Sequence, residues 1–224
     1  MAELHQVILF DVDDTLYDND RFAAELGIHL RDAFGALERD RYWGIFKVLR
    51  AQLGRADYLA ALQEFRPGLA GRPELLPELL GVSGFLLDYP FPSLLYPSAL
   101  AAVAHMGNFG LTAVLSDGDI VFQPRKIQRS GIWDAVDGRV MITIHKEHEF
   151  DAVEARFPAD HYVMVDDKPH LLAAMKARLG TRVTTVFVRQ GHYAHADDAG
   201  AAAPPPDRTI EHIADLLHWQ KDTP

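Results

Sequence analysis

The sequence of 224 residues contains no cysteine, which excludes disulfide bonds, thiolate zinc sites and cysteine nucleophiles. It also lacks any apolar run that approaches the length of a membrane-spanning helix. Positive charge is scarce, because 22 Lys and Arg residues stand against 32 Asp and Glu residues, for a formal net charge of -10. This balance argues against nonspecific binding to nucleic acid or anionic membrane, since both carry negative charge. We therefore expect neither kind of partner.

Composition and length are otherwise ordinary for a globular protein. Apolar residues make up 48% of the chain, enough for a sizeable core. The length exceeds that of a typical single domain, which predicts one core domain with an insertion or a small second domain. The first residues are polar and lead directly into a strand, without the features of a signal peptide, so we expect a soluble cytoplasmic protein. The sequence does not indicate an oligomeric state.

Short apolar runs alternate with helical patterns over most of the chain. The runs are continuous rather than alternating, as expected for parallel strands covered on both faces, and they predict an α/β fold with a Rossmann-like, doubly wound parallel sheet. The predicted strands are Val7 to Phe10, Leu111 to Leu115, Arg139 to Ile144, Tyr162 to Val165 and Arg182 to Val188. The predicted helices are Pro97 to Gly107, Pro124 to Arg129, Glu147 to Arg156, Pro169 to Leu179 and, after an Ala and Pro linker at 199–206, an amphipathic helix from Thr209 to Trp219.

One long stretch interrupts this alternation. Residues 18–87 show helical spacing of apolar side chains, with breaks at Gly54, at residues 66–68 and at residues 71–73, and no convincing core strand. Such a pattern predicts short antiparallel helices. The expected organisation is therefore a core of residues 1–17 and 88–224 with a helical domain, residues 18–87, inserted after the first strand.

Two carboxylate clusters directly follow two of the predicted strands. Asp11 and Asp13 come after the first strand, and Asp166 and Asp167 come after Tyr162 to Val165. The carboxyl ends of parallel strands line one crevice, so these clusters are expected to face each other and to hold one divalent cation. Mg²⁺ suits such a site, because it takes oxygen ligands and shares substrate phosphate.

The same residue types suit phosphoryl transfer. Asp11 can attack phosphorus to give an aspartyl phosphate, which splits one difficult displacement into two easier ones. Asp13 can protonate the departing alcohol and then help a water molecule attack the aspartyl phosphate. Ser116 and Lys146 also follow predicted strands, and a hydroxyl and an ammonium there can bind the equatorial phosphate oxygens.

These motifs together resemble the haloacid dehalogenase superfamily, in its phosphatase type and its subfamily I, which carries a helical cap after the first strand. Asp11 to Thr15 match its Asp-x-Asp-x-Thr motif, and Ser116, Lys146 and the Asp166-Asp167 pair match the three later motifs in order. The resemblance implies that the Asp11 side chain, the Asp13 backbone carbonyl and Asp167 ligate Mg²⁺, with Asp166 orienting a metal-bound water. It also implies a phosphatase rather than a dehalogenase, since dehalogenases of this superfamily lack an Asp at the position of Asp13.

Several positions are less clearly defined by the sequence. Asp117 stands beside Ser116 where relatives often have Asn, and it brings negative charge to the predicted substrate-binding site. Lys126 is a rival to Lys146, but we rank it as a surface charge because it lies within a helical segment. Thr15 is expected to fix the motif turn through its hydroxyl. The segment Arg189 to His195 is either part of the crevice rim or a surface loop.

The function that these residues favour is a Mg²⁺-dependent phosphomonoesterase acting on a small phosphorylated metabolite, since a cap over the crevice would exclude large chains. A phosphomutase remains an alternative, because it differs mainly in the group that receives the phosphoryl. A ligand-binding protein that kept the fold without turnover is the alternative from another class.

Overall fold

The computed structural model describes residues 5–194 and 203–220, and its centre is one six-stranded sheet. All pairs of neighbouring strands are parallel, and the strand order is β3-β2-β1-β4-β5-β6, the order typical of doubly wound dinucleotide-binding sheets. The strands are β1 (Gln6–Phe10), β2 (Leu111–Asp117), β3 (Val140–Thr143), β4 (His161–Asp166), β5 (Val183–Val188) and β6 (Arg208–Ile210). The predicted fold class is therefore confirmed.

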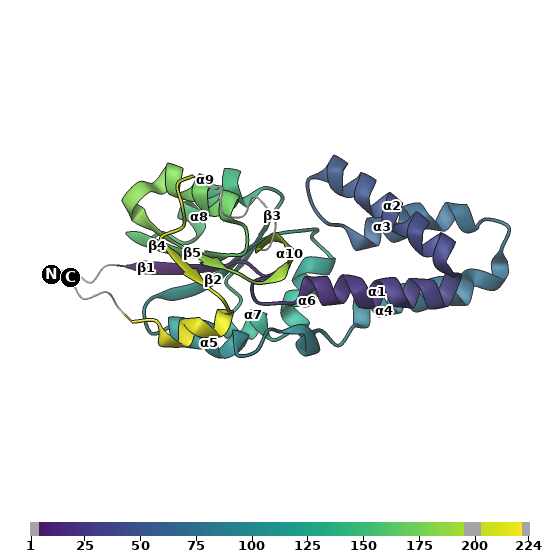
Figure 1. Ribbon diagram of the computed structural model, residues 1–224, viewed down its shortest axis with the longest axis horizontal. Helices are drawn as coiled ribbons and strands as arrows, with labels where there is room; N and C mark the ends of the chain where they lie inside the picture. The colour runs from purple at the N-terminus through teal and green to yellow at the C-terminus, as the bar shows by residue number, and fades with distance from the viewer. Residues whose placement is uncertain (1–4, 195–202, 221–224) are drawn as a thin grey trace.

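The continuous apolar runs place hydrophobic side chains on both faces of this sheet. Successive side chains of a strand point to opposite faces, so Ile8 and Phe10 join one hydrophobic core while Val7 and Leu9 join the other. Figure 1 shows the helices of the two layers above and below the sheet. One layer comprises α5 (Ala99–Met106), α6 (Phe122–Arg129) and α7 (Ile132–Ala135), and the other α8 (Phe150–Arg156) and α9 (Pro169–Leu179).

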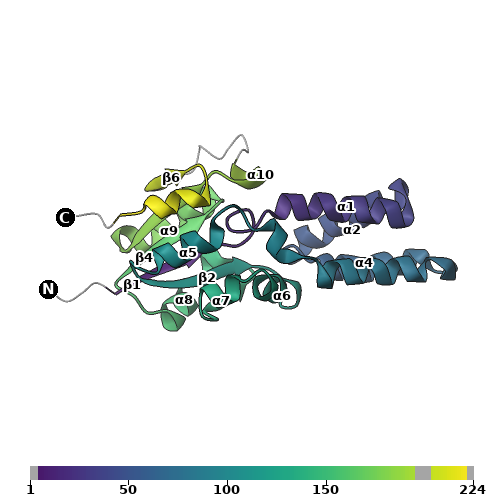
Figure 2. The ribbon, with the colours of Figure 1, turned by 90° about the horizontal axis from the view of Figure 1, so that it is seen from below.

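Four helices project beyond the end of the sheet and form what we call the helical insertion: α1 (Asn19–Phe34), α2 (Ala36–Leu53), α3 (Tyr58–Phe65) and α4 (Leu76–Asp88). Figures 1 and 2 show them side by side at one end of an elongated molecule. Local chemistry sets their bounds: Asp18 and Asp57 accept hydrogen bonds from the first turns of α1 and α3, and α2 ends at Gly54 with a φ of 70°.

Short 3₁₀ helices complete the chain: Arg66–Leu69, Pro73–Leu75, Phe91–Leu94, Lys146–His148, Gly180–Arg182 and Ile213–His218. A four-residue α-helix, α10 (Gly191–Ala194), follows β5. No described helix is long and apolar enough to cross a membrane.

The predicted C-terminal amphipathic helix from Thr209 to Trp219 is wrong. Arg208–Ile210 instead pairs with β5 as the edge strand β6, and only Ile213–His218 is helical, as a 3₁₀ helix packed near α5. Hydrogen bonds available at the open edge of β5 outweigh the local helical pattern, because each pairs a backbone group that would otherwise be exposed. The N-terminal part of the predicted linker at 199–206 lies outside the described residues.

Candidate functional site

The chain makes a tight turn immediately after β1. The backbone amides of Leu16 and Tyr17 both donate to the Val12 carbonyl, at 2.9 and 3.0 Å, and Asp14 adopts a left-handed φ of 58°. The amide of Asp11 donates to the Val165 carbonyl at 3.0 Å, which holds this residue beside the end of β4. The turn therefore directs Asp11 and its neighbours into the crevice at the carboxyl ends of the strands.

Lys146 lies in the floor of this crevice. Its Nζ donates to Asp11 Oδ1 at 2.6 Å and lies 2.6 Å from Asp166 Oδ2, and all three side chains are almost fully buried. Burial alone would lower the pKa of Lys146, but the two carboxylates raise it above its usual value. Burial would likewise raise the pKa of Asp11, yet Lys146 and then Lys168 lower it. Asp11 is thus held as a carboxylate.

Asp167 contrasts with these paired groups. Both of its carboxylate oxygens are buried without a hydrogen-bond partner among the described residues, as is Asp11 Oδ2. Burial raises the pKa of Asp167 well above its usual value. One oxygen each of Asp11, Asp166 and Asp167 lie within 4.8 Å of one another. A buried cluster of oxygens with unused lone pairs is the donor set that a hard divalent cation takes, so these residues fit Mg²⁺.

On another side of the crevice, hydrogen bonds from Gln123 join Ser116 to Asp13. Gln123 Nε2 donates to Ser116 Oγ at 2.9 Å and to Asp13 Oδ2 at 3.2 Å. Because Ser116 Oγ accepts this bond, its own proton remains available to a ligand. The Gln123 side chain lies so close to Gly118 that a Cβ at residue 118 would meet Gln123 Cβ at 2.8 Å.

Our ranking of Lys126 as a surface charge is wrong. Its side chain is 1% exposed, and Nζ donates to Asp13 Oδ1. Lys126 shares the buried face of α6 with Phe122, Gln123 and Ile127, so the aliphatic part of its side chain is covered while its amine reaches the crevice. The ammonium also lies 5.0 Å from the ring centre of Tyr17. Lys126 and Lys146 are therefore both buried, and each pairs with a different carboxylate of the first motif.

Asp117 faces the loop that carries Lys146. Its Oδ1 accepts hydrogen bonds from Thr143 Oγ1 at 2.7 Å and from the backbone amide of Lys146 at 2.9 Å. Burial raises the pKa of Asp117, although these donors and the Lys146 charge oppose the rise. The position of Lys146 thus depends on Asp117, and direct contact between Asp117 and a substrate stays a prediction.

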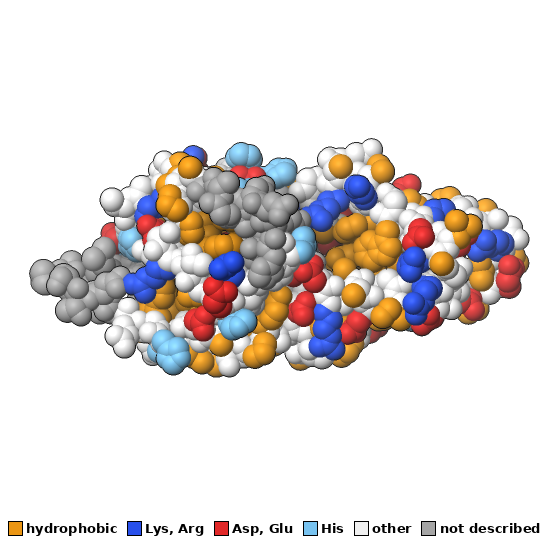
Figure 3. Space-filling model, viewed as in Figure 1, with side chains coloured by type: hydrophobic (Ala, Val, Ile, Leu, Met, Phe, Trp, Pro, Cys, Tyr) orange, Lys and Arg blue, Asp and Glu red, His pale blue; other side chains and the backbone are white. Residues whose placement is uncertain are grey.

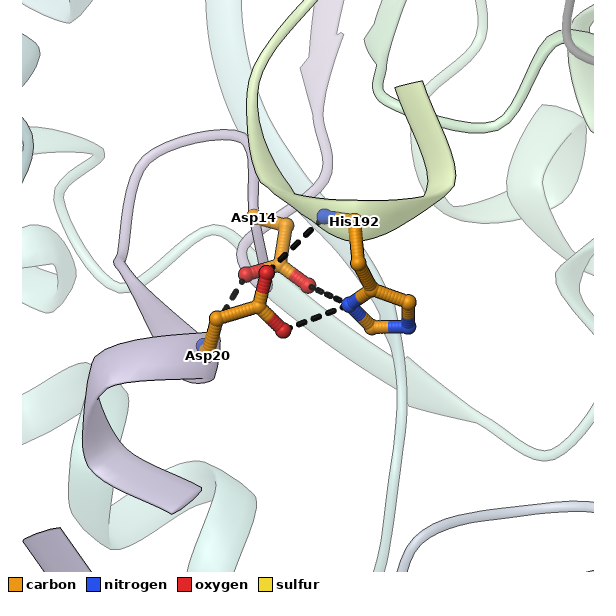
Figure 4. A group of neighbouring side chains, drawn as sticks. All are labelled: Asp14, Asp20 and His192. Atoms are coloured by element: carbon orange, nitrogen blue, oxygen red, sulfur yellow. Dashed lines mark hydrogen bonds and ion pairs between the residues drawn. The ribbon is translucent and has the colours of Figure 1, made fainter. Parts of the chain in front are cut away.

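A second group of potential cation ligands lies at the border between the core and the helical insertion. Figure 4 shows Asp14, Asp20 and His192 pointing toward one another. His192 Nδ1 lies 2.5 Å from Asp20 Oδ1, and the amide of His192 donates to Asp20 Oδ2 at 2.8 Å. Gly191 allows this approach, since a Cβ there would meet Asp14 Cβ at 2.4 Å. These side chains bind each other and join α10 to α1.

The structure bears on two further expectations, which concern the segment Arg189 to His195 and the Thr15 hydroxyl. Gln190 Nε2 donates to the Thr15 carbonyl at 3.4 Å, so the start of the segment Arg189 to His195 contacts the motif turn, while His195 lies outside the described residues. The Thr15 hydroxyl is buried and has no hydrogen-bond partner among the described residues. The turn is therefore held by backbone bonds rather than by this hydroxyl.

The family can be assigned from comparison with known proteins. Residues 5–178 match the model of a family described as haloacid dehalogenase-like hydrolase. The chain belongs to the haloacid dehalogenase-like hydrolase family. A crystal structure of a haloacid dehalogenase-like hydrolase from Burkholderia xenovorans is 53% identical, with a TM-score of 0.88 and coverage of 97% of each chain. No curated protein matches the chain.

More distant members of the family share the fold. An L-2-haloacid dehalogenase from Xanthobacter autotrophicus, with chloropropionic acid covalently bound, is 19% identical, with a TM-score of 0.60 and coverage of 96% of this chain and 98% of its own. A haloacid dehalogenase-type hydrolase from Bacillus subtilis, bound to magnesium, is 14% identical, with a TM-score of 0.62 and the same coverage. The family match supports a hydrolase. These distant likenesses show the shared fold and do not choose between substrates.

The four motifs that resemble the haloacid dehalogenase-like family come together in one crevice. These residues all lie at or just after the carboxyl ends of β1, β2, β3 and β4: Asp11, Asp13, Ser116, Lys146 and the Asp166-Asp167 pair. Sequence reasoning missed Gln123 and misplaced Lys126. Their spacing to Phe122 and Ile127 on one helical face was the available signal, and it was outweighed by the rarity of buried lysine.

Proposed function

We propose that the chain is a Mg²⁺-dependent phosphomonoesterase that hydrolyses a small phosphorylated metabolite through Asp11. The observation that carries the proposal is the arrangement of two carboxylates in one turn. Asp11 is buried against Lys146 and opposite Asp167, whereas Asp13 is held apart from them by Gln123 and Lys126. This arrangement supports Asp11 as the nucleophile and Asp13 as the residue that transfers protons.

The donor set also supports the proposed cation. Asp11, Asp166 and Asp167 would hold Mg²⁺ through carboxylate oxygens, together with the Asp13 backbone carbonyl that the family resemblance implies. When bound, Mg²⁺ would offset the repulsion between these carboxylates and a phosphate dianion. Lys146 and Ser116 supply the remaining phosphate contacts from the protein.

In the proposed reaction, a carboxylate oxygen of Asp11 attacks phosphorus and the bond from phosphorus to the ester oxygen breaks. Asp13, which enters this step as the carboxylic acid, gives its proton to the departing alkoxide, which leaves as an alcohol. Asp13, now a carboxylate, takes a proton from a water molecule that attacks the aspartyl phosphate. Inorganic phosphate leaves, and both aspartates return to their starting states.

Dehalogenation is the competing reaction within the family. A dehalogenase also forms an ester on an aspartate, but a halide leaving group needs no proton. The hydrogen bonds from Gln123 and Lys126 to Asp13 would then have no role in the first step, and the buried oxygens of Asp167 would have no cation to bind. These two features favour the phosphatase. The helical insertion is proposed as the cap that limits the size of the leaving group.

Hydrolysis of p-nitrophenyl phosphate tests the proposal, with release of chloride from 2-chloropropionate measured in parallel. We expect Mg²⁺-dependent release of phosphate and no release of chloride. Asp11→Asn should reduce kcat by at least about 10⁴-fold, because it removes the nucleophile. Asp151→Asn is a matched control, since Asp151 is exposed on α8 and pairs with Arg178. Chloride release without phosphate release would overturn the proposal.

A further inference from the structure

A cleft between the core and the helical insertion opens beside Asp13. It has a volume of about 190 Å³, and its lining combines residues of the first motif with residues of α2 and α3. Figure 3 shows hydrophobic side chains in this hollow, with Lys and Arg side chains along one border. Asp13 and Asp117 border both this cleft and the crevice, so a leaving group attached to a phosphate at Asp11 has this space beside it.

Aromatic side chains form the insertion side of the cleft. Trp43 and Phe46 are half-buried, and Phe46 stacks on the buried ring of Tyr58 with the ring centres 4.8 Å apart and the planes at 17°. The indole of Trp43 meets Phe46 edge to face at 5.4 Å. The rings thus brace one another, so flat aromatic surface is available without rearrangement.

Charges of both signs line the cleft. The core side carries Asp13, Asp14 and Asp117 together with Lys168 and His192, and the insertion side carries Arg50 and Arg55 together with Asp20. Trp43, Phe46 and Arg50 occupy positions i, i+3 and i+7 of α2 and therefore share one helical face. Arg50 lies one helical turn beyond Phe46, so a ring against Phe46 lies near a guanidinium group, a type of group that binds hydrogen-bond acceptors and anions.

The volume limits what can enter. At roughly 30 Å³ per water molecule, 190 Å³ corresponds to about six waters, a space that one ring fills and that a ring joined to a sugar would exceed. We propose that this cleft is the leaving-group subsite and that it selects phosphate esters of small alcohols with a single planar ring bearing an acceptor group. This inference rests on the proposed phosphomonoesterase function and names its substrate class.

Two esters of similar reactivity and size provide the test. Benzyl phosphate and cyclohexylmethyl phosphate both release primary alcohols, but only the first has a planar ring. We expect kcat/KM of the unaltered enzyme to be about fivefold higher for benzyl phosphate. Phe46→Leu should remove this ratio by lowering only the benzyl value. Phe34→Leu is the matched control, because Phe34 is half-buried and packs on Phe65 within the same insertion.

A second pair of esters tests the arginine border. Adding a carboxylate, as in 4-carboxybenzyl phosphate, should raise kcat/KM about threefold over benzyl phosphate, the scale of an exposed ion pair. Arg50→Gln should abolish this gain. Arg31→Gln should not, since Arg31 lies on α1 and pairs with its neighbour Asp32.

The possible results distinguish a failure of the proposed subsite from a failure of the proposed phosphomonoesterase function. Turnover of both ring and non-ring esters at equal kcat/KM by the unaltered enzyme would overturn the subsite and leave the phosphomonoesterase standing. An equal loss of the ratio in Phe34→Leu would also overturn it. Absence of Mg²⁺-dependent turnover of these esters and of p-nitrophenyl phosphate would overturn both. The ratio in the unaltered enzyme decides the matter even where Phe46→Leu does not fold.

Discussion

Two carboxylates at the ends of this sheet differ in how the protein surrounds them. At the edge formed by β5 and β6, Asp207 Oδ2 accepts hydrogen bonds from Lys176 Nζ and the Thr185 amide, both at 2.8 Å, and from Thr185 Oγ1 at 3.0 Å. In the crevice, both oxygens of Asp167 are buried and have no such donor among the described residues. Burial raises the pKa of Asp167, whereas the donors around Asp207 lower its pKa although burial opposes them.

The difference distinguishes a carboxylate that stabilises the fold from one that serves a ligand. An unpaired buried carboxylate costs free energy, so it persists only where function requires it. Asp13 lies between these extremes, because the buried ammonium of Lys126 and the amide of Gln123 hold it while a quarter of its side chain stays exposed. The crevice thus orients the Asp13 carboxylate and, among the described residues, provides no hydrogen-bond donor to Asp167.

Removing the amine of Lys126 is expected to give the largest effect among changes that spare the nucleophile. Lys126→Met should lower kcat for alkyl phosphates about 100-fold, because Asp13 loses the contact that orients it for proton transfer. Arg129→Met, on the same helix but exposed and paired with Asp88, should leave kcat unchanged. Steady-state kinetics with an alkyl phosphate measure kcat of both variants. An undiminished kcat in Lys126→Met would mean that the buried pair serves only the fold.

The open carboxylate of Asp167 predicts an effect of Mg²⁺ on stability that does not depend on turnover. At 100 times its Kd, a cation that binds only the folded state adds about 2.7 kcal/mol, which corresponds to a rise in Tm of roughly 5–10 °C. Asp167→Asn should lose most of this rise, and without Mg²⁺ its Tm should be no lower than that of the unaltered protein. Thermal unfolding with and without Mg²⁺ measures both. A full rise in Asp167→Asn would remove Asp167 from the cation site.

Substitution of Asp207 should have the smallest effect. It should lower the stability of the fold, whereas substitution of Asp167 should not lower it without Mg²⁺. Because its pKa is lowered in the folded state, Asp207 stabilises the fold above its ordinary pKa of about 4, and this stabilisation disappears as the pH falls through the lowered value. Asp207→Asn should therefore cost about 1 kcal/mol of unfolding free energy near pH 7, with the cost shrinking below about pH 4. Urea unfolding at a series of pH values tests this. Asp151→Asn, on an exposed carboxylate, should show no such pattern.

The central sheet and the four motifs can be predicted from the sequence because the residues that indicate them are close together along the chain. Each apolar run between Val7 and Val188 ends where the structure ends a strand or within two residues of it, and the carboxylates follow directly. The C-terminal segment could not be predicted this way, since Thr209 and Ile210 take their conformation from pairing with β5. That pairing is a contact between distant parts of the chain, which helical periodicity does not reveal.

The site shows the same division between local and distant information. Lys126 looks like an ordinary helix lysine until α6 is placed against the turn at Asp13. The spacing of Trp43, Phe46 and Arg50 on one face of α2 can be read from the sequence. That this face borders the cleft depends on how the helical insertion sits against the core.

Direct detection of the phosphorylated aspartate tests the central claim most closely. In Asp13→Asn with p-nitrophenyl phosphate, the first step needs little proton donation while the second lacks its base, so the aspartyl phosphate should accumulate. Acid quenching followed by mass spectrometry should place one phosphoryl group on Asp11. Turnover with no phosphoryl group on the protein, or with the group on another residue, would contradict the account.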